Sequence, residues 1–166
     1  MEPTTLSDTS ADATARTLKN ALLVYATEEQ AAASDFANLL EEEQATLLSG
    51  AVLDVLPHIV DRKSALIARL AELTQQRERC LAALGYGNGR PAMLKAVAQD
   101  PRLKPIWEDL VRHATQARSR NVTNGMLVRT RLDYNQRALN VLRDACGMTP
   151  VRVYGPDGRM SEFASR

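Results

Sequence analysis

The residues that most often perform chemistry are sparse in this chain and poorly placed for it. The two histidines, His58 and His113, lie far apart, and neither has a cysteine or carboxylate at the spacing of a metal site. No serine or cysteine has an evident base partner that would activate it as a nucleophile. The glycines of residues 85–89 alternate, but neither a Gly-Lys-Ser/Thr element nor a preceding strand makes them a phosphate loop. We therefore predict no enzyme activity, no metal and no cofactor.

The composition favours thin helical packing over a thick globular core. The 166 residues suit one domain, and 45% of them are apolar but only 4% aromatic. Aromatic side chains supply the large buried areas that fill wide interiors. Cys80 and Cys146 fall on apolar helical positions and are interpreted as small buried hydrophobes in a reducing cytosol. No signal peptide or membrane-spanning run is evident, so we expect a cytoplasmic protein without membrane insertion.

Charge is divided unevenly along the chain. Residues 1–50 hold nine acids and two bases, whereas residues 51–166 hold eleven acids and nineteen bases. The simpler interpretation is that an acidic first helix packs against a basic last helix. A nucleic-acid groove is the alternative, but the arginines from Arg102 to Arg143 are spaced around the helix, and only Tyr134 interleaves them. We expect no nucleic-acid partner.

The longest predicted element runs from Leu103 to Cys146, where the segment after Pro105 has no further proline and a single glycine, Gly125. Its 3–4 spacing defines a predicted seam of Trp107, Val111, Ala114, Arg118, Asn121, Gly125, Val128, Leu132, Asn135, Leu139, Leu142 and Cys146. The seam is apolar at its ends and polar or small in the middle. Such a helix is typical of a protein that presents a surface to other helices.

The whole chain is predicted to be all-α, an elongated antiparallel helical hairpin or three-helix coiled-coil bundle with a flexible C-terminal tail. The helical domain is expected over residues 14–147, after a disordered tail at residues 1–13 and before a flexible tail or weak hairpin at residues 148–166. Within the domain we predict helices over residues 14–48, from Pro57 to residue 84 after a short turn at 51–56, over 91–98, and over the long segment. A helix kinked at Pro57 is the alternative.

The predicted seams of the second and last helices are interrupted by polar residues, among them Lys63, Arg77, Asn121 and Asn135. Such residues cost stability but fix register, so a structural role is expected. Gly125 costs about 1 kcal/mol relative to alanine in mid-helix. Close approach of another helix is the simplest feature that would offset this cost.

The chain resembles the FlgN family of flagellar type III export chaperones. The similarity lies in residues 39–48 (LLEEEQATLL), 63–70 (KSALIARL), Trp107, 117–125 (ARSRNVTNG), Tyr134, Gln136, 138–142 (ALNVL) and 154–159 (YGPDGR). The resemblance implies a cytoplasmic chaperone that binds the C-terminal segments of the hook-associated proteins FlgK and FlgL. It also implies that the chaperone keeps them unassembled and delivers them to the export apparatus.

The seam pattern places the predicted client groove on the C-terminal half of the last helix. The candidate partner-binding residues are Asn121, Asn124, Gly125, Met126, Leu127, Val128, Leu132, Tyr134, Leu139 and Leu142. Pairing two helices leaves part of the seam open, and either the first helix or the client fills it. A coiled-coil oligomerisation module without a client is the alternative. A signalling bundle is a further one, but His113 lacks a supporting context, and a weak homodimer stays open.

Overall fold

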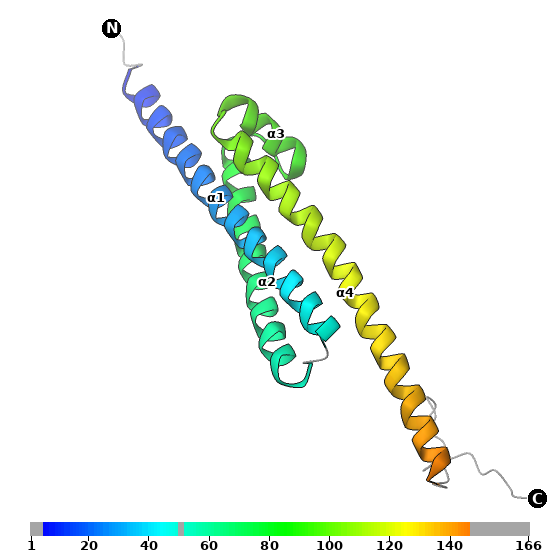
Figure 1. Ribbon diagram of the computed structural model, residues 1–166. Helices are drawn as coiled ribbons and strands as arrows, with labels where there is room; N and C mark the ends of the chain where they lie inside the picture. The colour runs from blue at the N-terminus through cyan, green and yellow to red at the C-terminus, as the bar shows by residue number, and fades with distance from the viewer. Residues whose placement is uncertain (1–4, 50–51, 147–166) are drawn as a thin grey trace, which may run out of the picture. The chain divides into compact units, whose positions relative to one another are not determined.

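The computed structural model describes residues 5–49 and 52–146, with side chains from residues 12–49 and 55–146. The described residues form four helices: α1 (Thr5–Ser49), α2 (Val52–Ala83), α3 (Gly89–Gln99) and α4 (Leu103–Ala145) (Figure 1). The predicted all-α class is confirmed. The chain divides into two compact units, residues 1–125 (unit 1) and residues 126–166 (unit 2), which are described separately.

Two predicted helix starts are corrected by the structure. Helix α1 begins at Thr5, so residues 5–13 are helical and not a disordered tail. This stretch lacks proline and glycine, the two residues that most disfavour a helix. Helix α2 begins at Val52 and contains Pro57, so the helix does not start at that proline. Pro57 is the sixth residue of α2, where a proline removes one backbone hydrogen bond and crowds the carbonyl four residues earlier, yet the helix continues through it. The predicted tail at 148–166 lies outside the described residues.

Helices α1 and α2 form an antiparallel hairpin (Figure 1). Glu43 of α1 pairs with Lys63 of α2 at 2.9 Å, and Glu29 pairs with Arg77 at 2.6 Å. The later residue of α1 pairs with the earlier residue of α2, and the earlier with the later, so the two helices run antiparallel. The hairpin is therefore held by ion pairs at both levels as well as by apolar packing.

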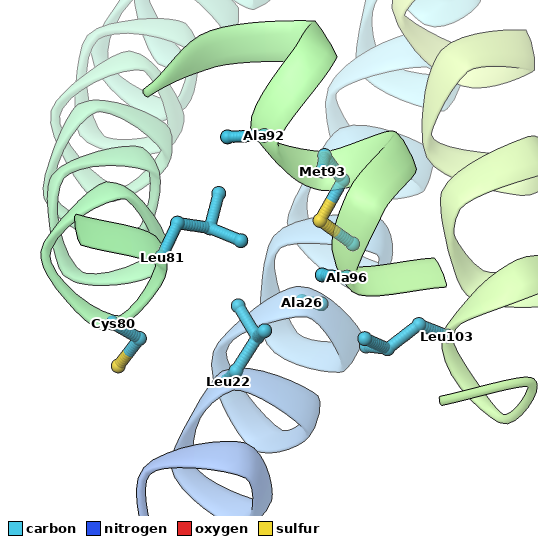
Figure 2. Packing of buried hydrophobic residues seen from close by; sticks show 8 residues of the cluster. All are labelled: Leu22, Ala26, Cys80, Leu81, Ala92, Met93, Ala96 and Leu103. Atoms are coloured by element: carbon cyan, nitrogen blue, oxygen red, sulfur yellow. The ribbon is translucent and has the colours of Figure 1, made fainter. Parts of the chain in front are cut away.

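Helix α3 corresponds to the short helix predicted at residues 91–98, and it packs into a hydrophobic cluster with the other three helices. Leu22, Leu81, Met93 and Leu103, one from each helix, are at most 1% exposed and point toward a common centre (Figure 2). The loop before α3 turns through Gly85 and Gly87, both with φ in the left-handed region that glycine adopts at least cost. The alternating glycines therefore serve this turn.

Within unit 1, α4 runs parallel to α1, and the buried seam of α4 lies one residue away from the predicted one. Leu103, Leu110, Ala117 and Asn124 of α4 are buried and follow one another every seven residues, the heptad spacing of a seam. The predicted residues Ala114, Arg118 and Asn121 are exposed. A shift of one residue rotates a helix face by about 100°. Apolar residues occupy both registers in the first turns, so the pattern alone did not separate them.

Candidate helix-binding surfaces

The polar seam residues of α2 join α1 in buried or half-buried contacts. Lys63 Nζ donates to both carboxylate oxygens of Glu43, at 3.1 and 2.9 Å. Arg77 Nε donates to Glu29 Oε2 at 2.6 Å, and the Thr74 hydroxyl donates to Glu29 Oε1 at 2.7 Å. Glu29 and Arg77 are 5% and 6% exposed, so each charge depends on the other for its solvation. These contacts fix the register of the hairpin, the structural role predicted for Lys63 and Arg77.

Arg77 also connects the hairpin to the other two helices of unit 1. Its guanidinium lies 5.6 Å from the centroid of the Trp107 ring of α4, within the range of a cation–π contact. Its Nη1 donates to Glu78 Oε1 at 2.7 Å, and Glu78 Oε2 accepts from the backbone N–H of Gly89 at 2.6 Å. The first amide of α3 is thereby satisfied by a carboxylate. Arg77 thus contacts Glu29 of α1 and Trp107 of α4 directly, and it is linked to α3 through Glu78.

Asn124 anchors α4 to α1 and does not present its amide to solvent. Its side chain is 2% exposed, and Nδ2 donates to the Leu40 carbonyl and to Glu43 Oε2, both at 2.8 Å. Arg120, one turn earlier, donates to the Ala37 carbonyl at 2.7 Å and pairs with Glu41 at 2.9 Å. The structure therefore places Asn124, a predicted client contact, inside unit 1. The neighbouring Asn121 is exposed.

An apolar groove of about 440 Å³ lies over α1, between α2 and α4. Its buried floor includes Ala33, Leu110 and Ala117. The remaining lining residues are Glu29, Phe36, Lys63, Ile67, Leu70, Thr74, Ala114, Arg118 and Asn121. Ile67 is 52% exposed at the rim, so part of the apolar lining of the groove is open to solvent. We call this feature the α1 groove; of the predicted site residues it contains Asn121 alone.

The charges around the α1 groove leave a positive excess. Glu29 is neutralised by Arg77, and Lys63 is neutralised by Glu43. Arg118 is exposed and has no ion-pair partner among the residues that the structure describes. Its guanidinium is therefore available to an acidic group brought by a partner.

In unit 2, four predicted site residues form one exposed apolar stripe. Val128, Leu132, Leu139 and Leu142 are 37%, 62%, 49% and 60% exposed. At about 100° per residue, they lie within about 80° of one another around the helix axis. We call these four residues the unit 2 stripe. Leucines are seldom left this open in such a row, so the stripe has the character of a partner surface.

The other predicted residues of unit 2 lie away from this stripe. Met126 and Tyr134 are 61% and 72% exposed, and about 160° and 120° around the helix from Val128. Leu127 is half-buried at about 100°. In unit 1, a Cβ added at Gly125 would meet no atom within 4 Å, so the described residues provide none of the close approach predicted there.

The acidic partners in the hairpin ion pairs were not predicted, although their spacing in the sequence indicates them. Glu29 and Glu43 stand fourteen residues apart, as do Lys63 and Arg77. Fourteen residues are two heptads, so two acids on one helix and two bases on the other share a face with matched spacing. Matched spacing of this kind would have predicted that these two faces pair, although equal spacings fit either helix direction.

The described residues include neither a membrane-spanning helix nor a cluster of metal ligands. None of the described helices is long and apolar enough to cross a membrane. No group of three or more histidine, cysteine, aspartate or glutamate side chains suited to a metal ion occurs in the described ranges. The prominent features of these ranges are instead an apolar groove and an apolar stripe, both on helices. They define a helical protein with surfaces suited to other helices.

Comparison with known proteins identifies the family. Residues 18–162 match the family model described as FlgN protein. The chain is 30% identical over 122 residues to the flagella synthesis protein FlgN of Yersinia enterocolitica, covering 72% of this chain and 76% of that protein. The same protein from the serotype O:8 / biotype 1B strain NCTC 13174 / 8081 gives the same values. No solved structure matches. The chain belongs to the FlgN family, whose members are flagellar chaperones.

Proposed function

We propose that this protein is a cytoplasmic flagellar export chaperone for hook-associated proteins. Its clients are the C-terminal segments of FlgK and FlgL, which it keeps unassembled and delivers to the export apparatus. The observation that carries the proposal is the unit 2 stripe, a row of four large aliphatic side chains left open to solvent. Membership of the FlgN family supports a flagellar partner.

The stripe suits an amphipathic segment that becomes helical on binding. Its 3–4 spacing matches the apolar anchors of a helix laid lengthwise on another helix. Residues 126–146 hold four arginines and two aspartates, so a segment with acidic side chains beside its apolar face is favoured. Ordering the segment costs several kcal/mol, which keeps the affinity moderate and the client releasable.

Aspartate substitutions in the stripe test the proposal. Leu132→Asp and Leu139→Asp should each weaken binding of a C-terminal FlgK peptide by at least about tenfold. A buried leucine contributes about 1.5–3 kcal/mol, and 1.4 kcal/mol is tenfold in affinity. Thr130→Asp, also exposed in α4 but off the stripe, is the matched control and should bind normally. Fluorescence anisotropy measures the affinity.

Circular dichroism of the same variants separates a client surface from a packed core. The exposed positions predict unchanged helix content in both leucine variants. Loss of helical signal in them would place the stripe in a permanent core. Normal peptide affinity in both, with normal helix content, would contradict the assignment of the client to this face.

The 3–4 spacing of the stripe also favours a second candidate, a coiled-coil oligomerisation module. A second copy would then cover the same four residues, and Asn135 would lie in the interface. This candidate predicts a stable homodimer that Leu132→Asp dissociates. Sedimentation equilibrium distinguishes the two candidates, because the oligomerisation module predicts a stable dimer in the absence of client. The chaperone proposal predicts instead that client binding does not depend on dimer formation.

A further inference from the structure

The α1 groove of unit 1 has the geometry of a second helix-binding site. We infer that it seats an amphipathic helix that carries an acidic side chain beside its apolar face, contributed by a second segment of the client. The inference rests on the proposed function, because the occupant belongs to the client. It goes beyond that function by giving the chaperone two separate contacts with one partner.

The spacing of the lining residues is the first support. Helix α2 contributes Lys63, Ile67, Leu70 and Thr74, and α4 contributes Leu110, Ala114, Ala117 and Asn121. Both sets follow steps of four, three and four residues, the spacing of one continuous face of a helix. Two such faces over a floor from α1 form a channel along helices, into which the ridge of a further helix fits.

The arrangement of unit 1 supports the same occupant. Both α2 and α4 pack on α1, and the groove shows that their facing sides stay apart over part of their length. Four-helix bundles fill such an opening with the apolar side of their fourth helix. Here the opening has a volume of about 440 Å³, which is room for several apolar side chains. It is lined mainly by aliphatic and aromatic carbon, so an apolar ridge is the group that gains most from entering it.

The charges at the α1 groove determine which kind of incoming helix is favoured. Arg118 at the groove is exposed and lacks an ion-pair partner among the described side chains, whereas Glu29 and Lys63 are each neutralised within unit 1. An acidic residue one turn from the apolar ridge of the incoming helix would pair with Arg118. A basic flank would meet like charge and cost affinity.

A second copy of this chain is disfavoured on the same ground. Its exposed apolar row, the unit 2 stripe, lies in a segment with four arginines and two aspartates, and would bring more bases to Arg118. A client with acidic flanks suits both surfaces. Two tethered segments of one client raise the overall affinity by effective concentration, often by 10²–10⁴.

Calorimetric titration of full-length FlgK, set against its C-terminal peptide alone, tests the inference. The groove variants are Arg118→Glu and Ile67→Glu, and both sites are exposed. Arg79→Glu is the charge-reversal control, since Arg79 is exposed on α2 and does not line the groove. We expect each groove variant to bind full-length FlgK at least about tenfold more weakly, and the peptide with normal affinity. Arg79→Glu should change neither.

The alternative outcomes are separable. Normal affinity of both groove variants for full-length FlgK would overturn the groove as a client site and leave the proposed function intact. Equal weakening toward full-length FlgK and the peptide would also overturn the second site, because the C-terminal segment itself would then occupy the groove. Failure of the unmodified protein to bind either probe would refute the proposed function, and the inference with it.

Discussion

Removal of the Arg77 guanidinium should destabilise unit 1 more than any surface substitution. The change Arg77→Met keeps an unbranched side chain but leaves Glu29 95% buried, with the Thr74 hydroxyl as its one remaining partner among the described side chains. Breaking a buried ion pair from one side costs about 3–5 kcal/mol, a large part of the roughly 5–15 kcal/mol that stabilises a typical domain. At about 2–4 °C per kcal/mol for a chain of this size, the melting temperature should fall by about 6–20 °C.

An exposed pair on the same two helices supplies the matched control. Arg62 and Glu42 pair at 2.9 Å, but their side chains are 57% and 45% exposed. Such pairs contribute about 0–1 kcal/mol, so Arg62→Met should lower the melting temperature by no more than about 4 °C. The double variant Glu29→Leu/Arg77→Met removes both buried charges and should recover much of the stability lost in the single variant.

Urea unfolding followed by far-UV circular dichroism measures these differences. Equal losses of unfolding free energy in Arg77→Met and Arg62→Met would refute the reasoning, because burial would then make no difference to the value of the pair. A double variant as unstable as Arg77→Met would show that the cost comes from lost packing of the arginine and not from the stranded carboxylate.

Three further predictions concern α4 and the thiols. Asn124→Ala should cost about 1–3 kcal/mol in urea unfolding, because the buried Leu40 carbonyl loses its side-chain donor. Gly125→Ala should raise stability by about 0.5–1 kcal/mol, since the added Cβ meets open space; a lower melting temperature would contradict this. Burial raises the pKa of the Cys80 thiol, whereas Cys146 is exposed, so a thiol reagent should modify Cys146 first and Cys80 only on unfolding. Because the raised pKa favours the protonated thiol in the folded state, the stability it confers should fall as the pH rises above 9.0 in urea titrations.

The sequence predicted helix content well because its punctuation is local. Proline and glycine bracket α3 and α4, and the stretch after Pro105, with no further proline and the single glycine Gly125, continues as one helix to Ala145. The start of α2 was missed because proline is favoured at the first position of a helix, whereas Pro57 is the sixth residue of α2.

The candidate site was harder to place, because helical spacing gives a face but not what covers it. In unit 1, two registers one residue apart both hold apolar residues, and only the packing of Leu110 and Ala117 on α1 selects between them. Asn124 was predicted to face a client for this reason, although its amide donates to Leu40 and Glu43. The prediction of Cys146 as buried was wrong for a similar reason, since helical spacing gave it an apolar position but the thiol is exposed.

The central claim is that this protein holds a client segment on the unit 2 stripe. The most direct test is isothermal titration of the purified chain with a C-terminal FlgK peptide of about 40 residues. We predict saturable one-to-one binding with a negative heat-capacity change, the mark of apolar surface buried on association. Absence of heat at high micromolar concentration, with a folded helical protein in the cell, would contradict the claim and favour the self-assembling coiled coil.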